Sequence, residues 1–270
     1  MKVVLFCGGM GLRLHPETEN IPKPLVQVGG KPVLTLLMKY YSYFGHNDFI
    51  LCLGYKGEEI KKFFLNYDEC LHADFVLSKG VNKQKLFKSD IEDWKITFAE
   101  TGLSSNLGQR LQAVQKYLDG EEVFLANYAD GITDLHLPDM ISYFKKRNKI
   151  GCLIAVKPAV VFHSVSIDKN GYVKRISQLN KTSLRINGGF FIFKKQIFDY
   201  IKPGEELVVE PFQRLIKKNE LLAYKYDGFW ASLDTYKDKQ RLDELATRNA
   251  PFWEIWNSCD HKVGEKNAQS

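Results

Sequence analysis

The sequence predicts an α/β fold: a doubly wound, mostly parallel Rossmann-like sheet with a smaller antiparallel portion. Residues 3–7 form a continuously apolar run that ends in a glycine-rich turn, as the first buried strand of a parallel sheet usually does. Apolar runs then alternate with segments of helical periodicity up to about residue 150. From residue 151 onward hairpin signals appear, as in Asp-Lys-Asn-Gly at 168–171, so this half is expected to be the more antiparallel one.

Each element follows from a local pattern. Short apolar runs bounded by turn residues predict strands, and apolar residues at helical spacing predict helices. Pro32 suits the first turn of a helix, and Thr235 with Asp238 has the spacing of a capping box that starts a closing helix. The expected strands are 3–7, 49–53, 75–77, 95–99 and 123–126, and the expected helices are 32–41, 57–64, 106–118, 138–146 and 239–248.

The length and composition are those of a folded globular protein. A chain of 270 residues with 44% hydrophobic content can form one large α/β domain or two smaller ones. Since no repeat or linker interrupts it, we expect a single domain over residues 1–257. Residues 258–270 are polar and lack periodicity, which predicts a flexible tail.

The spacing of the cysteines and the distribution of charge argue against several classes of binding partner. The five cysteines lack C-x-x-C spacing, so the sequence suggests neither a zinc site nor a disulfide framework, and a cytoplasmic location is expected. No apolar stretch approaches transmembrane length, so we expect no membrane partner. The net charge of +6 is dispersed among 32 acidic residues without an aromatic and basic strip, so no nucleic-acid partner is expected.

The first group of candidate functional residues follows the first predicted strand. Gly8, Gly9 and Gly11 would let a backbone wrap closely around a phosphate chain, and Arg13 and Lys23 would neutralise phosphate oxygens. The third glycine of a dinucleotide fingerprint and the G-K-[ST] of a P-loop are both missing. A plain structural turn is the alternative, but the position after the first strand and the two cations favour a phosphate loop.

The second group consists of two aspartates. Asp130 ends a buried strand, and Asp234 lies far away in the sequence, near the closing helix. Two converging carboxylates would suit Mg²⁺, which prefers oxygen ligands together with substrate phosphates. The alternative is that Asp130 starts a turn and Asp234 caps the last helix.

These segments resemble the signature of sugar-phosphate nucleotidyltransferases, and in particular the cytidylyltransferases among them. The resemblance extends through almost the whole chain to Trp253. Its specific points are Phe-Cys-Gly-Gly-Met-Gly-Leu-Arg-Leu at 6–14, Pro-Lys-Pro at 22–24, Gly-Gly-Lys-Pro at 29–32, Gly-Tyr-Lys-Gly at 54–57, Thr-Gly at 101–102, Arg-Leu at 110–111, Asp-Gly at 130–131, Ile-Asn-Gly-Gly-Phe-Phe at 186–191, Glu-Pro at 210–211, Gly-Phe-Trp at 228–230 and Asp-Thr at 234–235.

The resemblance implies an enzyme that takes CTP and a phosphorylated small-molecule acceptor, by default glucose 1-phosphate, with Mg²⁺ as cofactor, and that assembles as a homo-oligomer. An acceptor phosphate oxygen would attack the α-phosphorus in line, and pyrophosphate would leave. Residues 1–150 would mainly bind the nucleotide, and residues 151–257 would mainly bind the acceptor. The implied residues are Arg13 and Lys23 for catalysis, Gly8, Gly9, Gly11, Thr101, Gly102, Arg110 and Asp130 for the nucleotide, with Arg110 selecting cytosine, Asp130 and Asp234 for the metal, and His163, Lys181, Asn187, Gly188 and Glu210 for the acceptor.

Two alternatives to this function stay open. Another nucleotide, UTP or dTTP, would change only the base. A catalytically silent relative would bind nucleotide without transferring it, although the presence of both catalytic cations and both metal carboxylates favours an enzyme.

The acceptor side departs from the family pattern. Leu12 stands where the family usually has Thr, which leaves the backbone cradle possible. Val161-Phe162-His163 replaces an Arg-Phe-Gly segment, and Leu179 replaces a Lys that normally meets the sugar phosphate. We therefore expect glucose 1-phosphate to be a poor substrate and another phosphorylated acceptor to be held partly by Lys181 or Lys157. The alternatives are a surface role for both lysines, or a slip of the local alignment that leaves Lys181 with the usual task.

Overall fold

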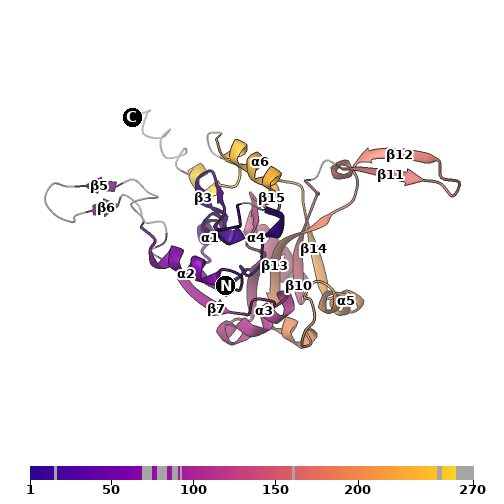
Figure 1. Ribbon diagram of the computed structural model, residues 1–270. Coiled ribbons are helices and arrows are strands. Elements are labelled where there is room, and N and C mark those ends of the chain that lie inside the picture. The colour runs from indigo at the N-terminus through magenta and orange to yellow at the C-terminus, as the bar shows by residue number, and fades with distance from the viewer. Residues whose placement is uncertain are drawn as a thin grey trace, which may run out of the picture.

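A seven-stranded sheet forms the centre of the protein, as a computed structural model describes it for residues 1–14, 17–68, 75–77, 84–86, 91, 93–159, 162–247 and 251–259 (Figure 1). The strand order is β14-β10-β13-β8-β1-β4-β7. In chain order these strands are β1 (Val3–Phe6), β4 (Asp48–Leu53), β7 (Lys95–Glu100), β8 (Val123–Asn127), β10 (Gly151–Val156), β13 (Ile186–Lys194) and β14 (Leu221–Tyr226).

The mostly parallel sheet is confirmed. β1, β4, β7 and β8 are parallel to one another, and β10 is parallel to β14. Antiparallel pairing enters after residue 151, as predicted, but in this sheet only through β13, which runs opposite to both β8 and β10. The second half of the chain therefore adds three strands to the same sheet, and the smaller antiparallel portion that was predicted is formed by separate short sheets such as β11–β12 (His163–Ile167 and Val173–Gln178). The reason is that β10 and the stretch of β13 from Gly188 to Phe193 are apolar and mostly buried, a pattern that suits the interior of a sheet.

Helices cover both faces of the sheet, as a doubly wound fold requires. One hydrophobic core joins the sheet to α1 (Val33–Tyr43), α2 (Gly57–Leu65) and α4 (Leu137–Arg147). The other joins it to α3 (Leu107–Val114) and α5 (Glu210–Lys217). No helix in the described ranges combines the length and the apolar character needed to cross a membrane.

Several predicted boundaries need correction. The capping box at Thr235 and Asp238 is present, but the helix it opens, α6 (Tyr236–Ala246), begins at Tyr236, because helical residues follow the N-cap directly. Its predicted end at residue 248 lies outside the described residues. The predicted helix 106–118 is α-helical to Val114 and continues as a 3-10 turn over Gln115–Leu118. The predicted tail starts later than residue 258, since a 3-10 turn covers Ile255–Cys259; residues 260–270 lie outside the described ranges.

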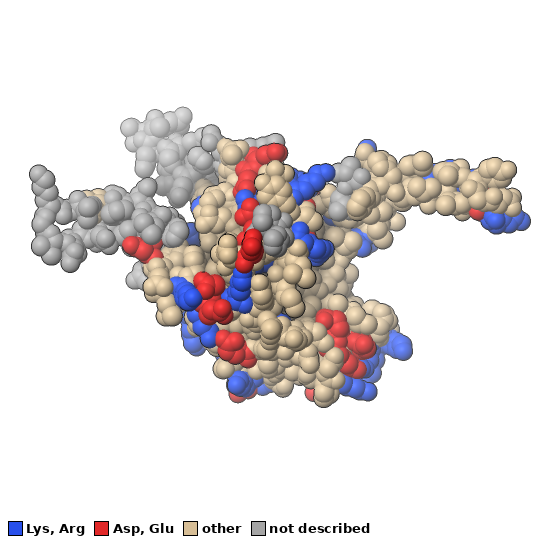
Figure 2. All heavy atoms as spheres, viewed as in Figure 1, with Lys and Arg blue, Asp and Glu red and all other residues tan. Residues whose placement is uncertain are grey.

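Two antiparallel ribbons lie apart from the main sheet. The predicted strand 75–77 is present as β5 (Phe75–Leu77), paired with β6 (Gln84–Leu86). The predicted hairpin is formed by β11 (His163–Ile167) and β12 (Val173–Gln178), and it projects well beyond the body of the protein (Figure 1). Figure 2 shows that most of its visible surface carries neither acidic nor basic side chains. Ile167, Tyr172 and Ile176 are each at least 60% exposed there.

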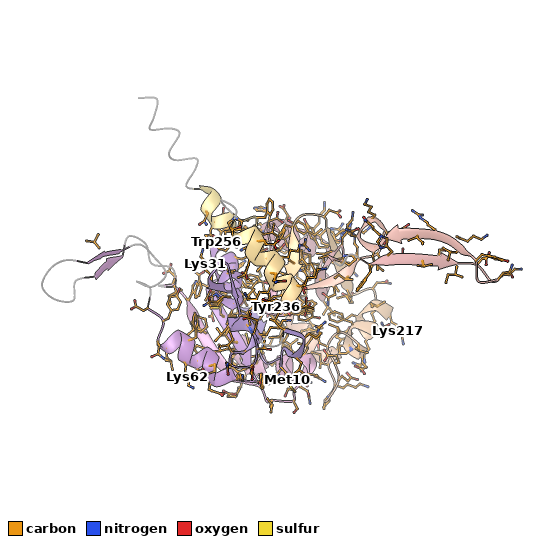
Figure 3. The ribbon with its side chains drawn as sticks, turned by 45° about the horizontal axis from the view of Figure 1, so that its top comes forward. Met10, Lys31, Lys62, Lys217, Tyr236 and Trp256 are labelled. Atoms are coloured by element: carbon orange, nitrogen blue, oxygen red, sulfur yellow. The ribbon has the colours of Figure 1, made fainter. Side chains whose placement is uncertain are left out.

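A third core brings the C-terminal segment against the N-terminal one. It joins Val28 and Val33 to Leu233, Leu242 and Trp253. Two short antiparallel pairs frame this core: β2 (Gln27–Val28) with β3 (Lys31–Pro32), and β9 (Gly131–Thr133) with β15 (Trp230–Ser232). Lys31 and Trp256, from opposite ends of the chain, consequently lie on the same side of the molecule, beside α6 (Figure 3). This long-range packing carries Asp234 to the edge of the sheet where β1 and β8 end.

His46, which follows α1, makes stability depend on pH. Its Nδ1 is buried without a hydrogen-bond partner, and burial, with the charges of the N-terminus and Lys145, lowers the pKa of His46 from 6.5 to about 4. Between these values the unfolded chain binds a proton that the folded chain does not, so stability falls as the pH drops from 6.5 to 4. Because water reaches part of the ring, we expect a loss of about 1 kcal/mol between pH 7 and 5.

Urea unfolding of the wild type and His46→Leu at the two pH values measures this effect. The variant should lose about 1 kcal/mol less than the wild type over that interval. Equal losses in both proteins would show that His46 is not the group responsible.

Candidate active site

The glycine loop lies at the carboxyl edge of the sheet, directly after β1. Its start is held by a hydrogen bond from Cys7 N to Cys52 O at 3.0 Å, which continues the pairing of β1 with β4. Gly11 has φ +64°, in the left-handed region that favours glycine, and Thr18 Oγ1 donates to Gly11 O at 3.0 Å. A Cβ at Gly9 would meet nothing within 4 Å, so the backbone is open to a ligand at this position.

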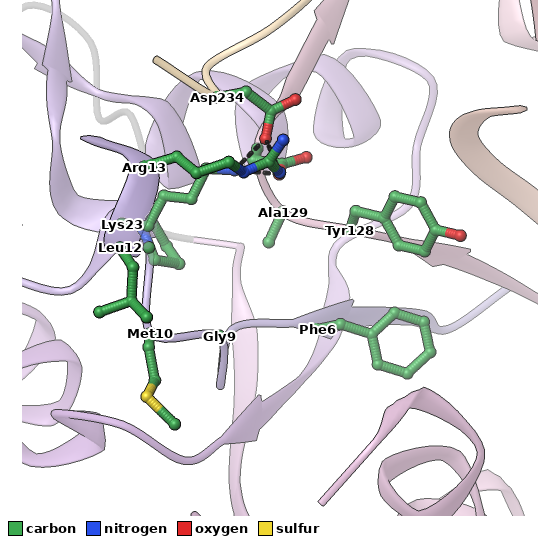
Figure 4. A pocket seen from close by; sticks show the side chains of 12 residues that line it. Phe6, Gly9, Met10, Leu12, Arg13, Lys23, Tyr128, Ala129 and Asp234 are labelled. Atoms are coloured by element: carbon green, nitrogen blue, oxygen red, sulfur yellow. Dashed lines mark hydrogen bonds and ion pairs between the residues drawn. The ribbon is translucent and has the colours of Figure 1, made fainter. Parts of the chain in front are cut away.

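Four charged side chains meet beside this loop (Figure 4). Lys23 Nζ donates to Asp130 Oδ2 at 2.6 Å and to Asp234 Oδ1 at 2.8 Å. Arg13 Nη2 donates to the same Asp234 oxygen at 2.8 Å. The structure thus brings together both cations of the loop and both predicted metal carboxylates.

The backbone around Asp130 explains how the two carboxylates converge. Ala129 has φ +62°, which is uncommon for a non-glycine residue, and Asn127 Oδ1 accepts a hydrogen bond from Ala129 N at 2.9 Å. Leu233 N donates to Asp130 O at 2.9 Å and fixes the neighbouring Asp234 at the same edge. The alternative role of Asp234, as the cap of the last helix, is not realised, because Thr235 is the N-cap of α6.

The two aspartates have different electrostatic environments. Burial raises the pKa of Asp130 above its usual range, and the adjacent Lys23 only partly offsets this effect. Burial acts in the same direction on Asp234, but Lys23, Ser232 and Arg13 together lower the pKa of Asp234. For Lys23, the two carboxylates outweigh the effect of burial and raise its pKa, so its ammonium stays charged at neutral pH.

Two cavities share three side chains of this charged cluster, and Lys23 lines only the first of them. The first, of about 460 Å³, lies along the glycine loop and is lined by Gly9, Gly11 and Lys23 among others. The second, of about 500 Å³, is lined by residues of β13, β15 and α6, including Asn187 and Gly188. Both cavities are also lined by Arg13, Tyr128, Asp130 and Asp234. A ligand in one cavity and a ligand in the other would therefore meet at Arg13, Asp130 and Asp234.

Several predicted residues do not line either cavity. Among the nucleotide residues these are Gly8, Thr101, Gly102 and Arg110, and among the acceptor residues they are His163, Lys181 and Glu210. His163 and Lys181 are exposed on the hairpin and on the turn after it. Lys157 also lies away from the second cavity and faces Asp227 at 3.8 Å. Val161 lies outside the described residues.

Arg110 is buried beneath the glycine loop. Nη1 donates to Leu53 O at 3.0 Å, Thr101 Oγ1 at 2.7 Å and Gly102 O at 2.9 Å, and Nη2 donates to Gly8 O at 3.2 Å. A Cβ at Gly8 would overlap this guanidinium, so glycine is required there for packing. Arg110 therefore joins the ends of β1, β4 and β7, and its selection of cytosine stays a prediction.

We expect Arg110→Ala to lower the free energy of unfolding by about 3 kcal/mol, because it removes a buried side chain together with its hydrogen bonds to Leu53 O, Thr101 Oγ1 and Gly8 O and leaves a void beneath the loop. Urea denaturation measures the loss. Lys116→Ala, an exposed residue on the turn that follows α3, is the matched control and should change stability by less than about 0.5 kcal/mol. A variant of unchanged stability that loses CTP binding would show that Arg110 acts on the base instead.

Tyr128 and Arg241 line the second cavity and were not among the predicted residues. Tyr128 Oη accepts a hydrogen bond from Asn187 Nδ2 at 2.9 Å, and its ring lies where a Cβ at Gly189 would be only 2.5 Å away. Arg241 is an exposed residue of α6. A sequence signal existed for each: Tyr128 is two residues from Asp130, and Arg241 lies six residues after the N-cap Thr235, on the same helix face as Asp238.

A glycine loop, two cations and two carboxylates at the carboxyl edge of a doubly wound sheet are features of an enzyme that acts on phosphate-containing substrates. Residues 2–239 match the family model described as nucleotidyl transferase, and the chain belongs to this family of enzymes.

Curated relatives match nearly the full length of the chain. It is 37% identical to the probable glucose-1-phosphate cytidylyltransferase of Bacillus subtilis, over 95% of this chain and 100% of that protein. It is 38% identical to the glucose-1-phosphate cytidylyltransferase of Salmonella typhimurium, over the same shares of the two chains.

Solved structures share the fold at low sequence identity. A putative glucose-1-phosphate thymidylyltransferase from Bacillus anthracis has a TM-score of 0.64 at 17% identity, with 93% of this chain and 98% of that chain covered. An apo UDP-glucose pyrophosphorylase has a TM-score of 0.66 at 19% identity, covering 90% and 97%. These similarities support the α/β architecture described above.

Proposed function

We propose that this enzyme transfers the cytidylyl group of CTP to a phosphorylated small molecule and releases pyrophosphate. The observation that carries the proposal is the cluster of Arg13, Lys23, Asp130 and Asp234, of which all four line the first cavity and Arg13, Asp130 and Asp234 also line the second. The first cavity would take the nucleotide and the second the acceptor, so residues 1–150 and 151–257 would serve mainly one substrate each. The two cytidylyltransferase relatives support CTP as the nucleotide and glucose 1-phosphate as the default acceptor.

The transfer needs positioning and charge neutralisation more than a protein nucleophile. An oxygen of the acceptor's phosphate forms a bond to the α-phosphorus of CTP, the bond from that phosphorus to the bridging oxygen breaks, and pyrophosphate leaves with the electron pair. The loop amides and Arg13 would hold the triphosphate, and Lys23 would neutralise charge that develops on it. Tyr128 and Asn187, joined by a hydrogen bond, would form the wall between the two substrates.

Mg²⁺ fits the carboxylates that the site offers. Asp130 and Asp234 both reach one Lys23 Nζ, so their oxygens converge on a single point. No group of three or more His, Cys, Asp or Glu residues in the described parts of the chain is arranged to hold a metal. Mg²⁺ commonly binds through one or two carboxylates plus substrate phosphates, which agrees with a site of this kind. Asp130 and Asp234 would hold the ion, which supplies positive charge to the phosphates.

A pyrophosphate-release screen of CTP, UTP, dTTP and GTP against a panel of phosphorylated sugars, polyols and other small metabolites tests the proposal. We expect CTP with at least one phosphorylated acceptor to release pyrophosphate, and Lys23→Ala measured in parallel controls for contaminating enzymes. Pyrophosphate release with UTP or dTTP alone would show that the enzyme uses that nucleotide instead of CTP. Nucleotide binding without pyrophosphate release from any pair would support the catalytically silent alternative and contradict the proposal.

We further propose that the enzyme is cytoplasmic and assembles as a homo-oligomer through the β11–β12 hairpin. The hairpin exposes apolar side chains at Val165, Ile167, Val173 and Ile176, which are between 50% and 62% exposed. Such a patch on a projecting ribbon favours burial against another protein surface. Light scattering should give a mass above that of the 31.1 kDa chain, and Ile167→Asp with Ile176→Asp should lower it. A monomeric wild type would contradict this proposal.

A further inference from the structure

The second cavity is lined by a cation that has no partner among the residues that the structure describes, and we propose that this cation, Arg241, binds the phosphate of the acceptor. The inference rests on the proposed function, because it assumes that the acceptor occupies this cavity. It identifies a residue that would set the acceptor's chemical class: a small molecule carrying a phosphate monoester or a comparable anionic group.

Among the described residues that line the cavity, every charged group except Arg241 is engaged by an ion pair or a hydrogen bond. Arg13 is bound to Asp234, and Asp130 is bound to Lys23. Asp238 accepts hydrogen bonds from Thr235 N and Thr235 Oγ1, both at 2.8 Å, within the capping box of α6. Within the described parts of the chain, Arg241 has neither an ion pair nor a hydrogen bond through its guanidinium. Its five donors are consequently available to a ligand.

The helix holds Arg241 in a fixed position facing the cavity. Thr235, Asp238, Arg241 and Leu242 are spaced by three or four residues and all line the cavity, so they form one face of the N-terminal part of α6. Leu242, next to Arg241, is 1% exposed in the third core. Asp243 accepts from Lys239 Nζ at 2.8 Å and from Gly29 N at 3.0 Å, which ties the helix to the N-terminal segment.

An acceptor phosphate in this cavity would need a cation as its partner. Asp130 and Asp234 would repel an acceptor phosphate dianion, and much of the remaining lining is apolar, including Leu179, Ile186 and Trp230. The cations that line it, as far as the chain is described, are Arg13, which Asp234 engages, and Arg241. Lys157 and Lys181, the replacements expected from the sequence, do not line it. Arginine also presents a planar fork that matches two phosphate oxygens at once.

Steady-state kinetics with CTP and glucose 1-phosphate, or the best acceptor of the screen, test the inference. Arg241→Ala should raise KM for the acceptor about 10- to 100-fold and change KM for CTP less than about twofold, since a hydrogen bond to a charged group is lost from one substrate only. Arg241→Met keeps most of the stem and should behave like Arg241→Ala. Lys237→Ala, on the same helix but outside the cavity lining, should match the wild type. An unchanged acceptor KM in Arg241→Ala, or a near-normal one in Arg241→Met, would overturn the inference while leaving the proposed function intact.

Direct binding separates this inference from a failure of the proposed function. Calorimetric titration of glucose 1-phosphate and of glucose into the full-length protein should show binding of the phosphate ester that is weakened at least about tenfold in Arg241→Ala. This result would support the role of Arg241 even if no acceptor in the screen released pyrophosphate. Equal binding of glucose 1-phosphate to the variant and to the wild type would overturn it, whatever the outcome of the screen.

Discussion

Lys23→Ala is expected to lower turnover with CTP by at least about a hundredfold, which corresponds to about 3 kcal/mol of transition-state stabilisation. Lys23 lines the nucleotide cavity, and its ammonium lies 2.6 Å from Asp130 and 2.8 Å from Asp234. The raised pKa of Lys23 keeps it charged across the neutral range, so it can neutralise phosphate charge throughout. The kcat measured at saturating CTP and acceptor checks the prediction.

The same variant should reveal what Lys23 does between the carboxylates. Without the lysine, two nearby negative charges face each other, and Mg²⁺ can take the place of the ammonium. Thermal unfolding of Lys23→Ala should therefore respond to Mg²⁺ more strongly than that of the wild type. Lys62→Ala, which removes an exposed ion pair with Glu59, controls for the loss of a surface lysine and should change neither property. Full activity, or failure to fold in the presence of Mg²⁺, would contradict a phosphate role for Lys23.

The glycine loop and its neighbours could be predicted because parallel strands end at one edge of a sheet. An apolar run followed by glycines fixes β1 and its turn, and Asp130 at the end of β8 must lie near them because β8 pairs with β1. Asp234 could not be placed in the same way. Its position depends on the pairing of β15 with β9 and on the third core, which joins the N-terminal segment around Val28 to the C-terminal segment around Leu242. Only the resemblance to the nucleotidyltransferase family placed Asp234 beside Asp130.

The sequence did not determine the directions in which the hairpin and several side chains point. A hairpin signal at 163–178 predicts two paired strands, but it does not say that the ribbon projects away from the site and carries His163 with it. Arg110 could be placed on a helix, yet its burial under Gly8 depends on three strand ends meeting. Arg241 was detectable in principle, because a helix that starts at Tyr236 places it on the same face as Asp238.

Asp130→Asn and Asp234→Asn are each expected to reduce Mg²⁺-dependent turnover by at least about a hundredfold. A neutral amide cannot balance a dication among phosphates, and it adds donors where the ion requires acceptors. Asn has nearly the same shape as Asp, and in each variant Lys23 keeps the other carboxylate as a partner, so both proteins should remain folded. Circular dichroism checks that both variants are folded, and Mg²⁺ titration of kcat checks the loss of Mg²⁺-dependent turnover.

The pH profile supplies a second test of Asp130. In the proposed reaction Asp130 acts as an ionised carboxylate, and burial raises the pKa of Asp130 from the ordinary value of 3.8. Activity of the wild type should therefore fall on acidification at a higher pH than an ordinary aspartate would give, while Asp234, whose pKa is lowered, is still ionised there. This decline should accompany weaker activation by Mg²⁺, because protonation of Asp130 removes one of its two carboxylates. Full turnover in EDTA, or an Asp130→Asn enzyme that still responds to Mg²⁺ as the wild type does, would contradict the assignment of these carboxylates to the metal.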